Sequence, residues 1–206
     1  MFNTIGIITK PKDFTSEETA RELSVFLHDK GVSLVEGYKQ ISKNADLIIV
    51  VGGDGSILNT ARTYVDSNIP ILGVNLGRLG FLADVSVENM IAAVEQILNG
   101  DFIKEERALL SCQIERGNKI ISKHLAFNDA VIHRNNAPRM IEFELLVDGA
   151  FVNNQRADGM IITTPTGSTA YALSSGGPIM HPSVKSICLV SISPHTMSHR
   201  PIIVHG

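Results

Sequence analysis

Five consecutive apolar residues, 47–51, lead directly into Gly52-Gly53-Asp54-Gly55-Ser56, and a helix-like stretch follows at once. Such an apolar run is typical of a parallel strand that is covered on both faces. Glycines permit left-handed backbone angles and the close approach of a ligand, and successive amides at a turn and a helix start favour phosphate. The carboxylate of Asp54 among such amides suggests a base acting on a hydroxyl beside a polyphosphate. The alternative is an ordinary strand-to-helix turn.

Strand and helix signals alternate over residues 1–101. Thr15 and Glu18 form a capping-box pattern ahead of a helix that ends at Lys30-Gly31, and Gly100 stops another helix over 86–98. Buried strands are expected at 5–8, 46–51 and 69–74, and a further short strand at 32–35. This order predicts an α/β domain with an open, mostly parallel, Rossmann-like sheet, in which ligands bind at the carboxyl ends of the strands.

Beyond residue 102 the apolar period changes from helical to two. Apolar and polar residues alternate over 141–148, and Asp148-Gly149 is a hairpin signal. Further strands are expected at 109–114, 120–125, 130–133, 160–163 and 187–192. The sequence therefore predicts a second, mostly β domain over residues 102–206.

Composition narrows the class of protein. The net charge is −3 and charged residues make up 19% of the chain, which argues against a general nucleic-acid binder. No stretch approaches the length of a membrane span, so we expect no membrane partner. Cys112 and Cys188 both lie in apolar surroundings and are expected to be reduced thiols. Together these features predict a soluble, cytoplasmic protein.

Polar clusters in the second half are candidates for ligand binding. They are Asn128-Asp129, Arg156 with Asp158, and the hydroxyl-rich segment 164–171. Each has a structural alternative: a strand-edge turn, a surface ion pair, and a helix cap supplied by Ser168 or Thr169. His195 and His199 are four residues apart, but Pro194 and Pro201 argue against a helical metal pair.

Taken together and in order, these stretches resemble the NAD kinase family. The matching segments are 52–55 (GGDG), 75–81 (NLGRLGF), 128–129 (ND, where many members have Glu second), 158–171 (DGMIITTPTGSTAY), 176–179 (GGPI), 194–196 (PHT) and 200–201 (RP). The GGDG loop alone is shared with lipid kinases of the diacylglycerol and sphingosine type and with 6-phosphofructokinases, so it indicates only the superfamily. The resemblance covers essentially the whole chain.

The resemblance implies transfer of a phosphoryl group from ATP or polyphosphate to the 2′-hydroxyl of the adenosine ribose of NAD. Asp54 would be the catalytic base, and the amides of Gly52, Gly53 and Gly55 would bind phosphate. Mg²⁺, or another divalent cation, would arrive with ATP, without a metal ligand predicted from the side chains directly. The implied NAD-binding residues are Asp54, Gly55, Phe81, Asn128, Asp129, Arg139, Arg156, Asp158, Thr166, Thr169, Ala170, Tyr171 and Ser174.

Within that set, Asn128 and Asp129 would hold ribose hydroxyls or base edges, and Phe81 would pack against a base. Arg156 would approach a phosphate from a neighbouring subunit, since the resemblance implies a homo-oligomer, a dimer or a tetramer. Members of the family continue beyond the counterpart of Gly206, so we expect the second domain to be incomplete. Three alternatives stay open: a lipid kinase, a catalytically inactive NAD-binding fragment, and a structural oligomerisation domain that retains the motifs.

Overall fold

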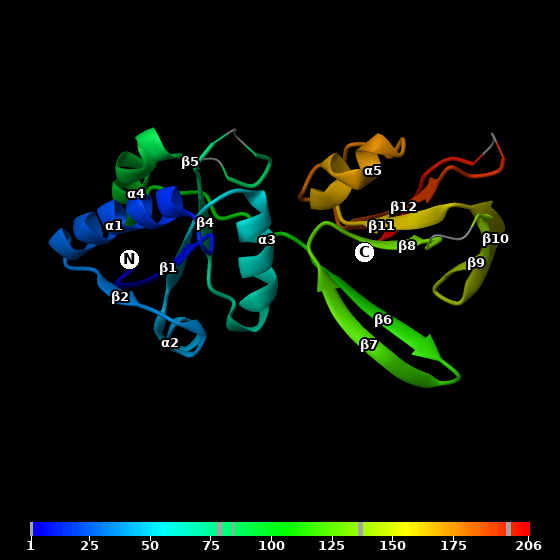
Figure 1. Cartoon of the computed structure of the whole chain (residues 1–206), viewed down its shortest axis with the longest axis horizontal. Coiled ribbons are helices and arrows are strands. Elements are labelled where there is room, and N and C mark those ends of the chain that lie inside the picture. The colour runs from blue at the N-terminus through cyan, green and yellow to red at the C-terminus, as the bar shows by residue number, and fades with distance from the viewer. Residues whose placement is uncertain (1, 78–79, 84, 136–137, 197–198) are drawn as a thin grey trace. The chain divides into compact units, whose positions relative to one another are not determined.

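The computed structural model describes residues 2–77, 80–83, 85–135, 138–196 and 199–206. The chain divides into two compact units, Met1–Glu105 and Glu106–Gly206, each with its own core (Figure 1). The boundary expected from sequence, after residue 101, lies just before this division. We describe each unit separately.

The first unit is a five-stranded parallel sheet with the strand order β2-β1-β3-β4-β5. Its strands are β1 (Thr4–Thr9), β2 (Ser33–Val35), β3 (Leu47–Val51), β4 (Ile71–Asn75) and β5 (Val85–Ser86). Its helices are α1 (Phe14–Asp29), α2 (Tyr38–Asn44), α3 (Asp54–Thr63) and α4 (Met90–Leu98), with 3₁₀ turns η1 (Val65–Ser67) and η2 (Val87–Asn89). The predicted open parallel α/β sheet is confirmed.

The central strand β3 is buried along its whole length because helices cover both of its faces (Figure 1). Ile49 and its alternate neighbours pack in one core with residues of α1 and α4. Ile48 and Val50 pack in a second core with Ile41 of α2 and Ile57 of α3. The continuous apolar run is therefore a consequence of burial on two sides, as expected for a parallel strand.

Helix ends follow the predictions in part. Gly31 and Gly100, just past α1 and α4, have left-handed φ values of 74° and 88°, which confirms both as stop signals. The predicted capping box is wrong, because Asp13 is the N-cap of α1 and its carboxylate accepts from the Ser16 amide at 3.0 Å. Thr15 consequently lies inside the first turn. Hydrogen bonds from the Ser16 amide and then from Lys10 hold the pKa of Asp13 below its usual value.

The second unit is built from antiparallel strand pairs in three sheets. The strands are β6 (Leu110–Arg116), β7 (Lys119–Ala126), β8 (Asp129–His133), β9 (Ile141–Val147), β10 (Ala150–Ala157), β11 (Gly159–Thr163), β12 (Ser186–Ile192) and β13 (Ile202–His205). The 3₁₀ turn η3 (Thr166–Thr169) and the short helix α5 (Tyr171–Ser174) follow β11. This arrangement confirms the predicted mostly β region.

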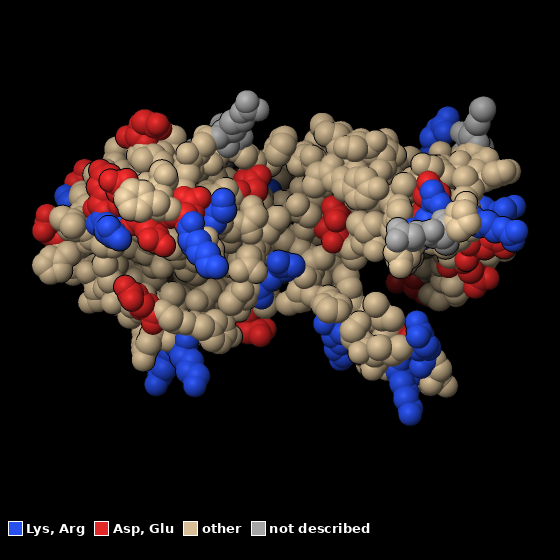
Figure 2. Space-filling model, viewed as in Figure 1, with Lys and Arg blue, Asp and Glu red and all other residues tan. Residues whose placement is uncertain are grey.

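The main sheet of the second unit has the order β13-β12-β11-β8, and its core includes Ile161, Cys188 and Val190. The β9–β10 hairpin turns at Asp148-Gly149, both with positive φ, as predicted. The β6–β7 hairpin extends away from the rest of this unit and carries Lys and Arg side chains (Figures 1 and 2). Among the described residues, no helix is both long and apolar enough to cross a membrane.

Candidate active site

The glycine-rich loop joins the end of β3 to the start of α3. The Gly52 amide donates to the Val74 carbonyl at 2.9 Å, which ties this residue to the end of β4. A Cβ on Gly52 would lie 2.7 Å from the Ser56 hydroxyl oxygen, so glycine leaves room here for the Ser56 side chain. The Gly52 amide thus already has a hydrogen-bond acceptor. Of the three glycine amides expected to bind phosphate, only those of Gly53 and Gly55 remain candidates.

Gly53 and Gly55 are exposed and lie in open space. Among the described residues, a Cβ on either would meet no heavy atom within 4 Å, and neither has a positive φ. No side chain caps α3, and the amides of residues 53–55 have no hydrogen-bond acceptor among the described residues. The backbone conformation and the protein's own packing therefore do not explain these two glycines, whereas the approach of an anion to bare amides would.

The carboxylate of Asp54 is half-buried and held by the loop after β4. Its Oδ2 accepts from the Phe81 amide at 3.0 Å, and its Oδ1 accepts from the Leu82 amide at 3.3 Å. The buried Asn75 shapes the start of this loop, because its Oδ1 accepts from the Gly77 amide at 3.2 Å. An ionised carboxylate can accept about four hydrogen bonds, so Asp54 keeps capacity for a ligand.

A lysine that the sequence analysis did not assign lies beside the glycine-rich loop. β1 and β3 are paired at Thr9 and Val51, so Lys10 follows the neighbouring strand end. The Ser16 hydroxyl donates to the Val51 carbonyl at 2.7 Å and accepts from the Lys10 amide at 3.0 Å. The Lys10 ammonium lies 3.3 Å from the Asp13 carboxylate and stays largely exposed. This arrangement fixes the backbone of Lys10 beside the strand end that carries the open amides.

In the second unit, Asn128 and Asp129 lie where β7 passes into β8. The Asn128 carbonyl accepts from the Thr164 amide at 2.8 Å and from the Thr163 hydroxyl at 3.1 Å. The side-chain Oδ1 of Asn128 is buried and has no hydrogen-bond partner among the described residues. Burial raises the pKa of the Asp129 carboxyl. A buried amide oxygen without a donor is costly, and a bound ligand would supply one.

The hydroxyl-rich segment separates into structural and exposed residues. The Thr164 hydroxyl donates to the Phe127 carbonyl at 2.7 Å, and the buried Ser168 hydroxyl donates to the Pro165 carbonyl at 2.6 Å. Ser168 also accepts from the Met180 amide at 3.0 Å. No side chain caps α5, so the helix-cap interpretation of Ser168 or Thr169 is wrong.

The NAD-binding candidates in this segment differ in exposure. Thr166 is buried, Thr169 and Ala170 are partly buried, and Tyr171 and Ser174 are exposed. Thr166 and Thr169 lie on η3, Tyr171 and Ser174 lie on α5, and Ala170 lies between these two elements, which follow β11.

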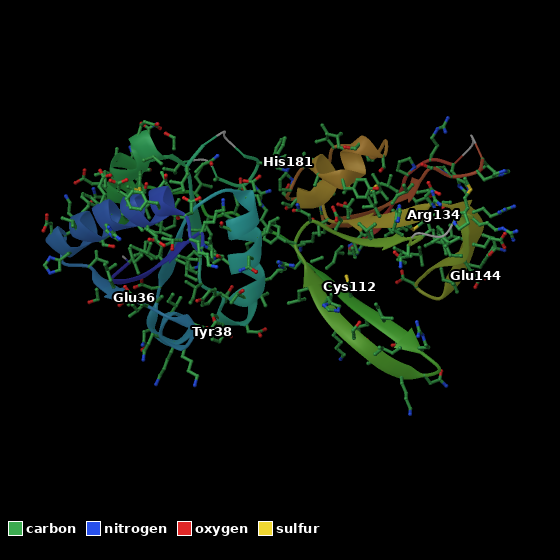
Figure 3. All side chains as sticks on the ribbon, in the orientation of Figure 1. Glu36, Tyr38, Cys112, Arg134, Glu144 and His181 are labelled. Atoms are coloured by element: carbon green, nitrogen blue, oxygen red, sulfur yellow. The ribbon has the colours of Figure 1, made fainter. Side chains whose placement is uncertain are left out.

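The charged candidates Arg156 and Asp158 form ion pairs with other residues and not with each other. Asp158 lies 2.6 Å from the Nε of Arg134, and Arg156 pairs across the hairpin with Glu142 at 3.1 Å. The suggestion that Arg156 and Asp158 form a surface pair is therefore wrong. Figure 3 labels Arg134 on the main sheet of this unit and Glu144 on the β9–β10 hairpin. Arg139 is exposed.

A groove of about 580 Å³ lies within the second unit. It is lined by Glu142, Phe143, Glu144, Asn154, Gln155, Arg156, His195, Thr196 and His199. His195 and His199 are not helical, and no set of three metal-ligating side chains occurs among the described residues.

Two family models match the chain. The ATP-NAD kinase N-terminal domain matches residues 33–102, and the ATP-NAD kinase C-terminal domain matches residues 127–206. The chain belongs to the NAD kinase family. It is therefore a phosphotransferase, and the interpretation as a lipid kinase is set aside.

Individual NAD kinases agree with this assignment. The NAD kinase of Hydrogenovibrio crunogenus is 46% identical over 224 residues, which cover 100% of this chain and 77% of that protein. The NAD kinase of Thiobacillus denitrificans is 42% identical, with 100% and 76% covered. Among solved structures, yeast NADH kinase complexed with NADH superimposes with a TM-score of 0.89 at 26% identity, covering 98% of this chain and 69% of that one. The Archaeoglobus fulgidus NAD kinase in complex with ATP gives 0.76 at 28% identity, covering 98% and 77%.

Three residues of this NAD kinase fold, Lys10, Gly80 and Arg134, have contacts that were not predicted from the sequence. Lys10 carried one available signal, since it directly follows a predicted buried strand. Gly80 lies in the segment 75–81 but had no assigned role. Arg134 offered no signal, because its partner Asp158 becomes a neighbour only through the register that pairs Gly159 with His133.

Proposed function

We propose that this chain transfers the γ-phosphoryl group of ATP to the 2′-hydroxyl of the adenosine ribose of NAD, giving NADP. The observation that carries this proposal is the oriented Asp54 carboxylate beside the open amides of Gly53 and Gly55. That arrangement provides a proton acceptor and a phosphate-binding backbone within one turn of α3. The complexes of a related NADH kinase with NADH and of a related NAD kinase with ATP support a nicotinamide dinucleotide and ATP as the two substrate classes.

In the proposed reaction Asp54 accepts a hydrogen bond from the 2′-hydroxyl and takes its proton as the new oxygen–phosphorus bond forms. The bond between the γ-phosphorus and the bridging oxygen breaks, and ADP leaves with its electron pair. Phosphoryl transfer needs positioning and charge neutralisation more than covalent help from the protein. The two backbone donors to Asp54 meet the first need, because they fix the orientation of the carboxylate.

The second need is met by the open amides and by positive charge. Gly53 and Gly55 would face phosphate oxygens, and Lys10 would add its ammonium from the neighbouring strand end. The Asp54 carboxylate also suits Mg²⁺ that arrives with ATP, because this ion is commonly held by one or two carboxylates together with substrate phosphates. When bound, the ion would neutralise phosphate charge that otherwise repels Asp54. Polyphosphate offers the same chemistry and is a second candidate donor.

The second unit would supply most NAD-binding groups. The buried, unpaired Oδ1 of Asn128 suits a donor such as a ribose hydroxyl or a base amino group, and Asp129 lies next to it. Asp158, the partly buried Thr169 of η3 and the exposed Tyr171 and Ser174 of α5 would contact the bases. In the first unit, the ring of Phe81, 71% exposed, would pack against a base. Arg139 would reach an anionic group of the substrate.

We also propose a homo-oligomer, in which Arg156 would reach a phosphate bound by a neighbouring subunit. The β6–β7 hairpin supports this proposal, because it exposes Ile114, Ile120 and Ile121. A two-stranded hairpin is marginally stable in water unless another surface covers it.

The decisive experiment replaces the base while keeping its shape. Asp54→Asn should abolish NADP formation, because the amide cannot accept the proton, while NAD affinity stays within about tenfold. Calorimetric titration with NAD and a coupled assay of NADP measure the two effects. Asp66→Asn, an exposed aspartate in η1, is the matched control and should leave both unchanged. Comparable turnover by Asp54→Asn would remove Asp54 from the role of base.

A further inference from the structure

The loop after β4 grips the Asp54 carboxylate with two consecutive backbone donors. The Phe81 amide reaches Oδ2 at 3.0 Å, and the Leu82 amide reaches Oδ1 at 3.3 Å. Since each oxygen has its own donor, the pair fixes the rotation of the carboxylate as well as its position. A single donor would leave the group free to turn about its last bond.

Gly80 makes this grip possible. A Cβ on Gly80 would lie 2.1 Å from Oδ1, 2.5 Å from Cγ and 2.6 Å from Oδ2 of Asp54, and these are its three nearest atoms. The space taken by the Asp54 carboxylate therefore demands glycine at this position.

We propose that residues 80–82, here called the Gly80 cradle, are a positioning element for the catalytic carboxylate, and that Phe81 links it to the bound substrate. This inference rests on the proposed function. Phe81 donates its amide to Asp54 and also presents its exposed ring to solvent. Phe81 alone would therefore hold a stacked purine in a fixed position relative to the catalytic carboxylate of Asp54. Gly80 and Leu82 act through Asp54 and contact no reacting atom themselves.

The test compares two glycines of the same loop. Gly80→Ala pushes the carboxylate off its donors and should lower kcat about 100-fold, the cost expected for a displacement of about 1 Å, with KM for NAD within about threefold. Gly77→Ala is the control, because a Cβ there would meet no atom of the described residues within 4 Å and the position does not have a positive φ. It should keep kcat and KM unchanged. Phe81→Leu keeps the amide but loses the ring, and should instead raise KM for NAD about tenfold.

A double-variant cycle separates positioning from a general structural role. Asp54→Ala removes the three atoms that a Cβ at position 80 would strike. Gly80→Ala should therefore lower the unfolding temperature in the natural background but leave it unchanged in the Asp54→Ala background. If Gly80→Ala alone fails to fold, the double variant should still fold, and its failure to do so would overturn the proposal.

Two further results would also overturn it: equal kcat for Gly80→Ala and Gly77→Ala, or a Gly80→Ala defect confined to KM. Failure of the proposed function is distinguishable from these outcomes. In that case the natural chain and Gly77→Ala would both fail to form NADP, whereas failure of the cradle leaves both active.

Discussion

Ser168 and Thr169 are adjacent hydroxyl residues for which the structure predicts opposite defects. The Ser168 hydroxyl is fully buried, donates to the Pro165 carbonyl at 2.6 Å and accepts from the Met180 amide at 3.0 Å. Ser168→Ala leaves the Met180 amide without this acceptor in a buried place. An unsatisfied buried donor costs about 1–3 kcal/mol, so we expect a loss of about 2 kcal/mol in the free energy of unfolding.

For a 206-residue chain, that loss corresponds to a fall of about 4–8 °C in the unfolding temperature, measured by calorimetry. Thr169→Val is the matched comparison, because the Thr169 hydroxyl makes only a long contact of 3.4 Å and is partly buried. It should change the unfolding temperature by less than about 2 °C and raise KM for NAD. An unchanged unfolding temperature for Ser168→Ala, or a larger fall for Thr169→Val, would refute the assignment of Ser168 to structure.

Two further predictions concern the strand end beside the glycine-rich loop. Lys10→Ala should raise KM for ATP about tenfold through loss of a phosphate contact, with KM for NAD unchanged. Steady-state kinetics measure both constants, and Lys39→Ala, which replaces an exposed lysine of α2, is the control. An equal effect of the two substitutions would contradict the prediction. The lowered pKa of Asp13 means that its contribution to stability is present above the usual value of 3.8 and is lost as pH falls through the folded-state value. The difference in unfolding temperature between the natural chain and Asp13→Ala should therefore shrink as pH falls from about 5 to about 3; a difference that stays constant would argue against an ionised cap.

Elements whose burial produces a local pattern of apolar residues could be predicted from the sequence. The apolar runs at β3 and β12 are recognisable because both strands are mostly buried. Helix α2 has only one buried residue, Ile41, so it shows no apolar stripe and was missed. Strand β10 was missed because polar residues 153–156 dominate it, although pairing with β9 holds it in place. The cap of α1 was misplaced because Asp13 and Thr15 are both good caps, and only the course of the chain after β1 decides between them.

The glycines of the site show that a sequence motif can indicate a function without indicating what each of its residues does. In sequence, positions 52, 53, 55 and 80 look alike, yet the structure assigns them three different causes. Gly52 makes room for Ser56, Gly53 and Gly55 leave amides bare, and Gly80 makes room for the Asp54 carboxylate. Of these four glycines, only Gly53 and Gly55 are explained by the approach of a ligand.

The same distinction holds in the second unit, where a Cβ on Gly167 would lie 2.2 Å from the Asn128 carbonyl oxygen. Gly167 therefore keeps the backbone of Asn128 close to the turn after β11, where Thr164 holds it with an amide hydrogen bond. The side-chain oxygen of Asn128 is buried and has no hydrogen-bond partner within the part of the chain that the structure describes. In each unit, then, one glycine makes room for a residue of the proposed site: Gly80 for the Asp54 carboxylate, and Gly167 for the Asn128 backbone carbonyl. Substitutions at Gly80 and Gly167 should accordingly alter the reaction through Asp54 and Asn128, whereas substitutions at Gly53 and Gly55 should act on the phosphates directly.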